Sequence, residues 1–276
     1  MDYIYYINGK WVSANKASIP FNDAGFLYGD GLFETIRFDN HNLFSVDKHI
    51  KRLISGLKVI NLNLSISKNE LLMLIKNIIV KNNLKSGIIR LMVTRGTLHS
   101  LLEETKPNIY ISIKPFYDIP KNPVNVIFYS EQKFPIIRFI PGIKSMNYLG
   151  NMLAKKECNK DGGFEPVFYN KNDIITECAI RNIFFIKDKT ILTPSLNLGI
   201  LSGVMRETIF DIAKYLDINC IEKHIHKDEL DTMDEAFITS TGIGLLPCYW
   251  DNKKFNFKLT TSLKKELFNR INNTNL

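Results

Sequence analysis

The apolar residues of this chain recur with two different periods, which separate predicted helices from predicted strands. Apolar side chains return every three or four positions from Asp47 to Ile60 and from Ser67 to Ile79, so both stretches predict amphipathic helices. Ser67 and Glu70 have the spacing of a capping box, which places the start of the second helix. Two more helices are predicted, one after Tyr148 to about Lys160 and one from Ser202 to Leu216.

Short runs rich in Ile, Val and Phe, bounded by turn residues, predict strands. Asn8-Gly9 is a hairpin turn between the first two runs, and Asp39-Asn40 lies in a second hairpin. The predicted strands are residues 4–7, 10–12, 33–38, 43–44, 88–94, 109–113, 124–129, 166–169, 174–177, 183–186, 190–192, 220–225, 235–239 and 244–246.

The order of these elements predicts an α/β fold in two domains. Residues 1–115 form an α+β N-terminal domain, and residues 124–276 form a C-terminal domain rich in short strands. Residues 116–123 follow Pro115 and contain Pro120 and Pro123, which makes this stretch the predicted interdomain linker.

Composition narrows the class of protein without naming a function. Of the 276 residues, 45% are hydrophobic and 23% charged, as in ordinary globular proteins. The net charge of +8 comes from scattered basic residues, which favours anionic small molecules over nucleic acid as partners. The four cysteines include no C-x-x-C pair, so neither a metal site nor a disulfide framework is expected. Without a signal peptide or a membrane-length apolar run, a cytoplasmic protein with no membrane partner is expected.

Lys144 is the first candidate for chemistry. Pro141-Gly142 ends one element, Lys144 follows, and a helix begins a few residues later. A lysine at such a junction can extend from a loop into a cleft. The alternative is a solvated lysine, because the chain has 36 Lys and Arg residues.

Three other features suit an anion. Ser202-Gly203 precedes a helix whose first N–H groups point outward, which is the geometry of a phosphate site. Ser240-Thr241-Gly242 follows a strand and adds hydroxyl groups, and Arg52 lies on a helix beside Leu53. Each also has a plain structural interpretation as an N-cap, a turn or a surface arginine.

Glu177 ends an apolar strand, so its carboxylate needs a partner. The partner is either an arginine such as Arg181 or a ligand nitrogen whose proton the carboxylate holds. A lysine, a buried carboxylate and an anion cradle together suggest pyridoxal 5′-phosphate.

The sequence resembles a known family, the class IV aminotransferases, which have pyridoxal-phosphate fold type IV. The family comprises branched-chain and D-amino-acid aminotransferases and aminodeoxychorismate lyase. The matching segments follow the family order over nearly the whole chain: Gly25-x-x-x-Gly29-Asp30-Gly31-Leu32-Phe33-Glu34-Thr35-x-Arg37, His49-x-x-Arg52-Leu53, Lys144-Ser-x-Asn147-Tyr148-Leu149, Thr176-Glu177-x-x-x-x-Asn182-Ile183-Phe184, Thr193-Pro194, Ile200-Leu201-x-Gly203-Val204-x-Arg206 and Asp234-Glu235-x-Phe237.

The resemblance implies a D-amino-acid aminotransferase-like fold, whose C-terminal domain has a barrel-like sheet, and a homodimer. It implies that Lys144 is the catalytic Schiff-base lysine and that Glu177 is the partner of the pyridine nitrogen. The other cofactor-binding residues that it implies are Arg52, Tyr148, Leu201, Gly203, Val204, Met205, Ser240 and Thr241.

The substrate is less well specified by the sequence. The candidates for substrate contacts are Phe33, Arg37, Arg90, Arg95 and His99. The family's D-specific members carry a tyrosine where Phe33 stands, which argues against a D-amino acid. We therefore expect transamination between an L-amino acid, branched-chain-like, and a 2-oxo acid. The alternatives are aminodeoxychorismate lyase, which gives 4-aminobenzoate and pyruvate, and a cofactor-carrying binding protein without catalysis.

Overall fold

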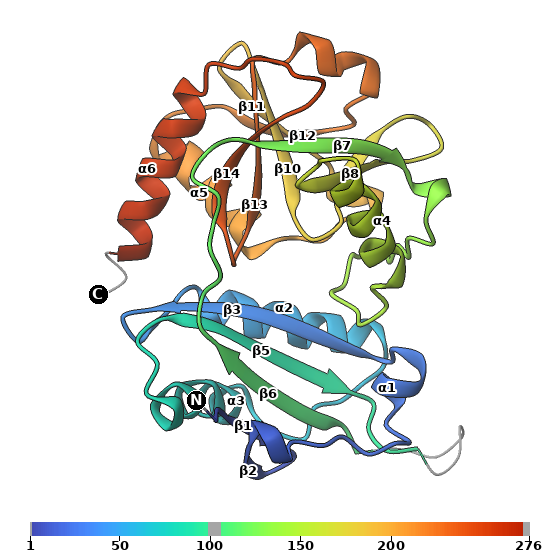
Figure 1. Ribbon diagram of the computed structural model, residues 1–276, viewed down its shortest axis with the longest axis vertical. Helices are drawn as coiled ribbons and strands as arrows, with labels where there is room; N and C mark the ends of the chain where they lie inside the picture. Colours follow the sequence, from blue (N-terminus) through green and yellow to red (C-terminus); the bar gives the residue numbers. More distant parts are fainter. Residues whose placement is uncertain (1, 99–105, 273–276) are drawn as a thin grey trace. The chain divides into compact units, whose positions relative to one another are not determined.

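The computed structural model describes residues 2–98 and 106–272, whose contacts divide them into two units (Figure 1). The first unit takes the described residues up to Tyr117 together with Ile143–Asn147. The second takes Asp118–Gly142 and the described residues from Tyr148 onward. The segment that carries Lys144 therefore has its contacts in the first unit, whereas the sequence-based boundaries assigned it to the C-terminal domain.

The first unit is built on a six-stranded antiparallel sheet with the order β2-β1-β6-β5-β3-β4. Its strands are β1 (Ile4–Ile7), β2 (Lys10–Ser13), β3 (Gly31–Asp39), β4 (Asn42–Leu43), β5 (Gly87–Thr94) and β6 (Asn108–Lys114). Its helices are α1 (Ala24–Tyr28), α2 (Val46–Val59) and α3 (Lys68–Asn82), with a short 3₁₀ helix at Ala14–Lys16.

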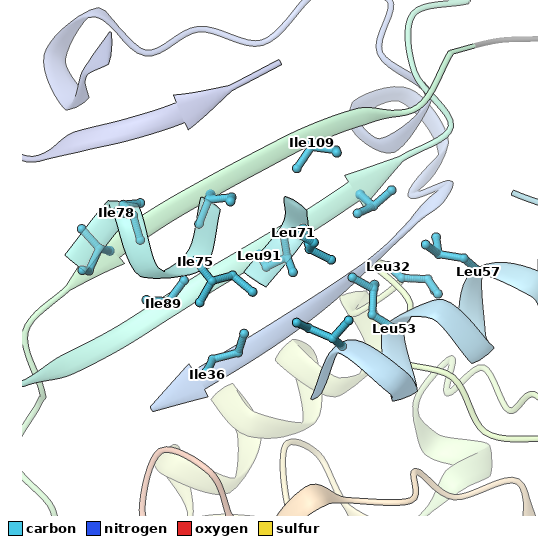
Figure 2. Close-up of a cluster of buried hydrophobic side chains, with 14 of the residues drawn as sticks. Leu32, Ile36, Leu53, Leu57, Leu71, Ile75, Ile78, Ile89, Leu91 and Ile109 are labelled. Atoms are coloured by element: carbon cyan, nitrogen blue, oxygen red, sulfur yellow. The ribbon is translucent and has the colours of Figure 1, made fainter. Parts of the chain in front are cut away.

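Alternation along β3 separates the two faces of this sheet. Leu32 and Ile36 point to the side covered by α2 and α3, where they pack with Leu53 and Leu57 of α2 (Figure 2). Phe33 and the other odd-numbered residues of β3 therefore lie on the face opposite these helices. Of the candidate residues in β3, Phe33 and Arg37 are odd-numbered and so belong to this second face.

The second unit is built on an eight-stranded mixed sheet with the order β12-β11-β10-β13-β14-β7-β8-β9. Its strands are β7 (Val124–Ser130), β8 (Glu165–Tyr169), β9 (Ile175–Cys178), β10 (Asn182–Lys187), β11 (Thr190–Pro194), β12 (Cys220–Lys223), β13 (Glu235–Ser240) and β14 (Gly244–Tyr249). Its helices are α4 (Leu149–Lys160), α5 (Val204–Tyr215) and α6 (Lys258–Asn272), with 3₁₀ helices at Glu131–Lys133, Leu196–Leu198 and Lys227–Thr232.

The central strands of the second sheet are buried on both faces. Consecutive residues Ile183, Phe184 and Phe185 of β10 are all fully buried, so this strand shows no polar alternation. Phe184 stacks on Phe237 of the neighbouring strand β13, with ring centroids 4.9 Å apart. The sheet thereby forms a curled, barrel-like core, as predicted.

Most predicted elements are confirmed, including the hairpin at Asn8-Gly9 and the capping box between Ser67 and Glu70. The helices α1 and α6 were not predicted. The apolar residues Leu149, Met152 and Leu153 at the start of α4 do not form its buried face, since they are 70%, 44% and 43% exposed. The buried positions of α4 are Gly150, Ala154 and Cys158. In the described part of the chain, no helix is long and apolar enough to span a membrane.

Candidate active site

Lys144 is positioned by backbone pairing with the start of β3. The Phe33 N–H donates to the Lys144 carbonyl over 3.0 Å, and the Met146 N–H donates to the Gly31 carbonyl over 2.9 Å. Leu32 and Ser145 form the antiparallel bridge between these two bonds. Lys144 is therefore directly opposite Phe33, and opposed residues of an antiparallel pair share one face. The lysine side chain lies on the second face of the first sheet, opposite α2 and α3.

Phe33 brings a second cation close to this lysine. The Lys144 Nζ lies 4.4 Å from the centroid of the Phe33 ring, and the Arg90 Cζ lies 4.0 Å from the same centroid. Arg90 reaches Phe33 because it pairs with Thr35, two residues further along β3 on the same face. Met92 of β5 is the residue opposite Phe33, so it lies on the side of Phe33 away from Lys144. An amine and a guanidinium thus share one aromatic ring.

On the helix-covered face, Glu34 holds Arg52 and His49. Arg52 donates to both Glu34 oxygens, from Nε over 2.8 Å and from Nη2 over 2.6 Å. His49 Nδ1 lies 2.7 Å from Glu34 Oε2, and both of these side chains are fully buried. Burial by itself would raise the pKa of the Glu34 carboxyl, but Arg52 and His49 outweigh it and lower that pKa to about 2. Burial is also the main reason that the pKa of His49 falls below its ordinary value. The carboxylate therefore fixes the orientation of the Arg52 guanidinium.

In the second unit, Glu177 is held at both oxygens. The Leu201 N–H donates to Glu177 Oε2 over 3.2 Å, and Arg138 Nη1 donates to Oε1. Of the two alternatives that the sequence left open for Glu177, an arginine partner is present, but it is Arg138 and not Arg181. Arg181 instead pairs with the buried Glu165 at the start of β8. Only the folded structure decides which of these two arginines reaches Glu177.

The predicted anion-binding segments of the second unit meet around Asn182. This residue pairs with Thr239 in the sheet, just before Ser240 and Thr241, and its side-chain amide donates to the Leu201 carbonyl over 2.9 Å. Gly203 is the N-cap of α5, and a Cβ there would lie 2.0 Å from the Asn182 Oδ1. A side chain at Gly203 would therefore force the Asn182 amide or the loop to shift. The loop delivers buried Val204 and Met205 to the first turn of α5.

The remaining predicted residues have local partners or positions in their own units. Arg37 bonds Asp39 over 2.5 Å, and Arg95 bonds Asp30 over 2.6 Å and the Ile60 carbonyl over 2.8 Å. Tyr148 is the half-buried N-cap of α4. His99 lies outside the described residues.

The structure thus collects the predicted residues in two sets. Phe33, Arg52, Arg90 and Lys144 belong to the first unit, and Glu177, Leu201, Gly203, Val204, Met205, Ser240 and Thr241 belong to the second.

Sequence analysis missed several side chains that organise these sets. Glu34 and His49 carried a signal, because a glutamate in an apolar strand and a histidine one helical turn before Arg52 both invite a buried partner. Asn182 appeared only within a family motif. Arg138 gave no local signal, since its partner Glu177 is 39 residues away.

The sequence of this chain is similar to a family model and to known proteins. The family model for amino-transferase class IV matches residues 31–249. A putative branched-chain-amino-acid aminotransferase of Methanocaldococcus jannaschii is 32% identical over 267 residues, covering 95% of this chain and 93% of that protein. The D-alanine aminotransferase of Staphylococcus aureus is 33% identical over 250 residues, covering 88% of this chain and 86% of that protein.

Solved structures agree in fold. The Escherichia coli branched-chain amino acid aminotransferase superposes with a TM-score of 0.89 at 25% identity, covering 98% of this chain and 94% of that one. A putative 4-amino-4-deoxychorismate lyase from Legionella pneumophila gives 0.84 at 25% identity, covering 94% and 97%. A second branched-chain amino acid aminotransferase, solved with pyridoxamine 5′-phosphate, gives 0.86 at 20% identity over 98% of this chain and 94% of that one.

Proposed function

The chain belongs to the class IV aminotransferases, and on that premise we propose that it uses pyridoxal 5′-phosphate to move the amino group of an L-amino acid to a 2-oxo acid. We assign Lys144 as the residue that binds the cofactor covalently and carries the proton during transfer. We assign Glu177 as the partner of the pyridine nitrogen. The amides of Val204 and Met205, the hydroxyls of Ser240 and Thr241, and the Arg52 guanidinium are proposed to hold the phosphate.

The donor groups suit this cofactor. A primary amine on an aromatic sheet face, a carboxylate ordered at both oxygens and a glycine-capped helix start are the chemical types that it requires. When bound, pyridoxal 5′-phosphate supplies an aldehyde for the lysine amine and a protonated ring that withdraws electrons. The residues of this chain then orient the substrate and move the proton.

One observation carries the choice of an amino-acid substrate, the shared contact of Arg90 and Lys144 with Phe33. A substrate that reacts near the lysine amine can place a carboxylate on Arg90, a guanidinium suited to bidentate binding. Phe33 and Met92 beside it are apolar, which favours an aliphatic side chain. The branched-chain relative supports the same choice. Arg37, Arg95 and His99 stay weaker candidates for substrate contacts.

A second candidate function is the lyase reaction that releases pyruvate from aminodeoxychorismate. It is favoured by the likeness to the Legionella pneumophila protein. A D-amino acid as donor is suggested by the Staphylococcus aureus relative but disfavoured by phenylalanine at position 33.

We further propose a cytoplasmic homodimer. The support is an exposed apolar cluster around α1, in which Phe21 is 81% and Phe26 57% exposed. Their rings lie 5.9 Å apart, so the cluster is a continuous surface. Phe26→Ser should weaken self-association in sedimentation experiments. The matched control Phe268→Ser, at a side chain of α6 that is 65% exposed, should leave it unchanged. A monomeric wild-type protein would refute the dimer.

The central experiment is spectroscopic. The purified protein should show the visible absorbance of a lysine-bound cofactor, and borohydride should abolish it. Lys144→Ala should lose this band, whereas the exposed control Lys156→Ala should keep it. A band that survives Lys144→Ala would overturn the assignment.

Single-turnover experiments with the loaded protein test which class of substrate reacts. L-leucine, L-glutamate, D-alanine and aminodeoxychorismate are each added to loaded protein. We expect the L-amino acids to convert the cofactor to its amino form. Formation of 4-aminobenzoate without that conversion would favour the lyase. Arg90→Ala should raise KM for carboxylate substrates, and an unchanged KM would remove Arg90 from the site.

A further inference from the structure

Arg138 joins Glu177 to a second carboxylate, Glu131. Its Nη1 donates to Glu177 Oε1, while its Nε donates to Glu131 Oε1 over 3.0 Å and its Nη2 to the same oxygen over 2.5 Å. Each of the three side chains is at most 18% exposed. One guanidinium therefore neutralises one of two carboxylates, and the cluster keeps a net charge of −1.

Thr176 closes the cluster. Its hydroxyl accepts from Arg138 Nη2 over 3.1 Å and donates to Glu131 Oε1 over 2.7 Å. The guanidinium is thus fixed by contacts on one side that do not involve Glu177. Its remaining edge presents a defined donor to the carboxylate. Arg138 is positioned whether or not Glu177 has a ligand.

The charges have a chemical consequence. Burial by itself would lower the pKa of Arg138, but Glu177 and Glu131 outweigh it and raise that pKa, so the guanidinium stays cationic. A fixed cation beside Glu177 favours its ionised form. Without Arg138, two neighbouring carboxylates would repel one another and one would take up a proton. A protonated Glu177 could no longer accept the proton of a ring nitrogen.

We propose that Arg138, held by Glu131 and Thr176, is a positioning residue that keeps Glu177 ionised and oriented, so that the cluster holds the proton on the ring nitrogen of the cofactor. The proposal rests on the proposed role of Glu177. Glu131 sets the net charge: with it, the three groups attract a protonated ring, and without it, their charges sum to zero.

The first measurement uses the cofactor-free protein, so it does not depend on the proposed function. The δ-carbon of Glu177, assigned with Glu177→Gln, is followed by ¹³C NMR during a pH titration. Arg138→Met should raise the proton affinity of Glu177 about 10- to 1000-fold. An unchanged titration would overturn the proposal. Cys178, next to Glu177 on β9, is acted on by the charges of Glu165, Arg181 and Glu177, so these groups are included when the titration is fitted.

A double substitution separates charge from packing. In the Arg138→Met background, Glu131→Gln removes the repelling carboxylate and should return the titration of Glu177 towards its ordinary range. A purely structural role for Arg138 would give no such rescue, because the second substitution removes another contact. Arg138→Lys retains the charge but not the planar guanidinium with its several donors. The proton affinity of Glu177 in this variant should lie between those in wild type and Arg138→Met. Absence of rescue in the folded double variant would contradict the electrostatic role.

The second measurement uses the loaded protein. With ¹⁵N-labelled pyridoxal 5′-phosphate, the nitrogen chemical shift should report a protonated ring in wild type and in the double variant, and a less protonated ring in Arg138→Met. A ring nitrogen equally protonated in all three would refute the proposal. Failure of Lys144→Ala to abolish the visible band would instead refute the proposed function and leave the cofactor-free titration standing.

Discussion

Removal of the buried charge of Glu34 gives the sharpest test of the first unit. Glu34→Gln keeps the size of the side chain but leaves Arg52 facing a neutral amide. The Glu34 pKa of about 2 lies below the ordinary value of 4.5, and this difference corresponds to about 3 kcal/mol of folding free energy. Loss of one partner from a buried ion pair typically costs about 3–5 kcal/mol, in agreement.

The pH dependence has a definite sign. Because the folded-state pKa of Glu34 is depressed, its contribution is complete above pH 4.5 and disappears as the pH falls towards 2. His49 acts in the same direction, since its lowered pKa makes the fold lose stability as the pH falls below 6.5. The variant lacks the Glu34 contribution at every pH. Its deficit should therefore be largest at neutral pH and should shrink below pH 4.5.

The assay is urea unfolding of the cofactor-free protein at fixed concentration, followed by circular dichroism. Glu70→Gln is the matched control, because glutamine preserves the exposed capping box with Ser67 while a carboxylate is removed. Its stability should change little. Surface substitutions typically change the free energy of unfolding by less than about 0.5 kcal/mol. If the free energy of unfolding of Glu34→Gln at pH 7 differs from that of wild type by no more than this, the ion-pair reasoning is wrong.

Four further outcomes are expected. Asp23 accepts three side-chain hydrogen bonds at one oxygen and caps α1 with the other, so Asp23→Asn should lower stability by at least about 2 kcal/mol. In an ultraviolet titration the same variant should lower the pKa of Tyr110, which burial and then Asp23 raise, and an unchanged value would contradict that contact. Gly203→Ala forces a Cβ against the Asn182 amide and should cost about 1–3 kcal/mol in urea, whereas a neutral effect would show that the loop can shift. All four cysteine thiols have pKa values raised chiefly by burial, so the native protein at pH 8 should react with a disulfide reagent far more slowly than unfolded protein, and fast labelling would disprove this.

Local sequence determined most of the elements. The spacing of apolar residues identified α2 and α3, and Asn8-Gly9 identified the first hairpin, because these signals depend only on near neighbours. The helix α6 had such a signal in Leu263 and Leu267, four residues apart and both buried, yet it was not predicted. The five-residue helix α1 is too short to show a period, and its local signals are confined to the caps Asp23 and Gly29.

The sequence also singled out the chemically important residue types. Lys144, Glu177 and Gly203 stood out because a lysine after Pro-Gly, a carboxylate in an apolar strand and a glycine before a helix are locally unusual. Their order along the chain then matched a family. Their roles in binding the cofactor stay predictions.

Only the tertiary structure decided which side chains these residues face. Lys144 lies on the second face of the first sheet because its backbone pairs with Phe33, 111 residues earlier, and a shift of one residue would turn the amine to the other face. Glu177 contacts Arg138 rather than nearby Arg181 because the fold brings the segment after β7 to β9, while Arg181 pairs with Glu165 of β8. Periodicity reports which side of an element is apolar, whereas register and strand order depend on packing between segments that are distant in sequence.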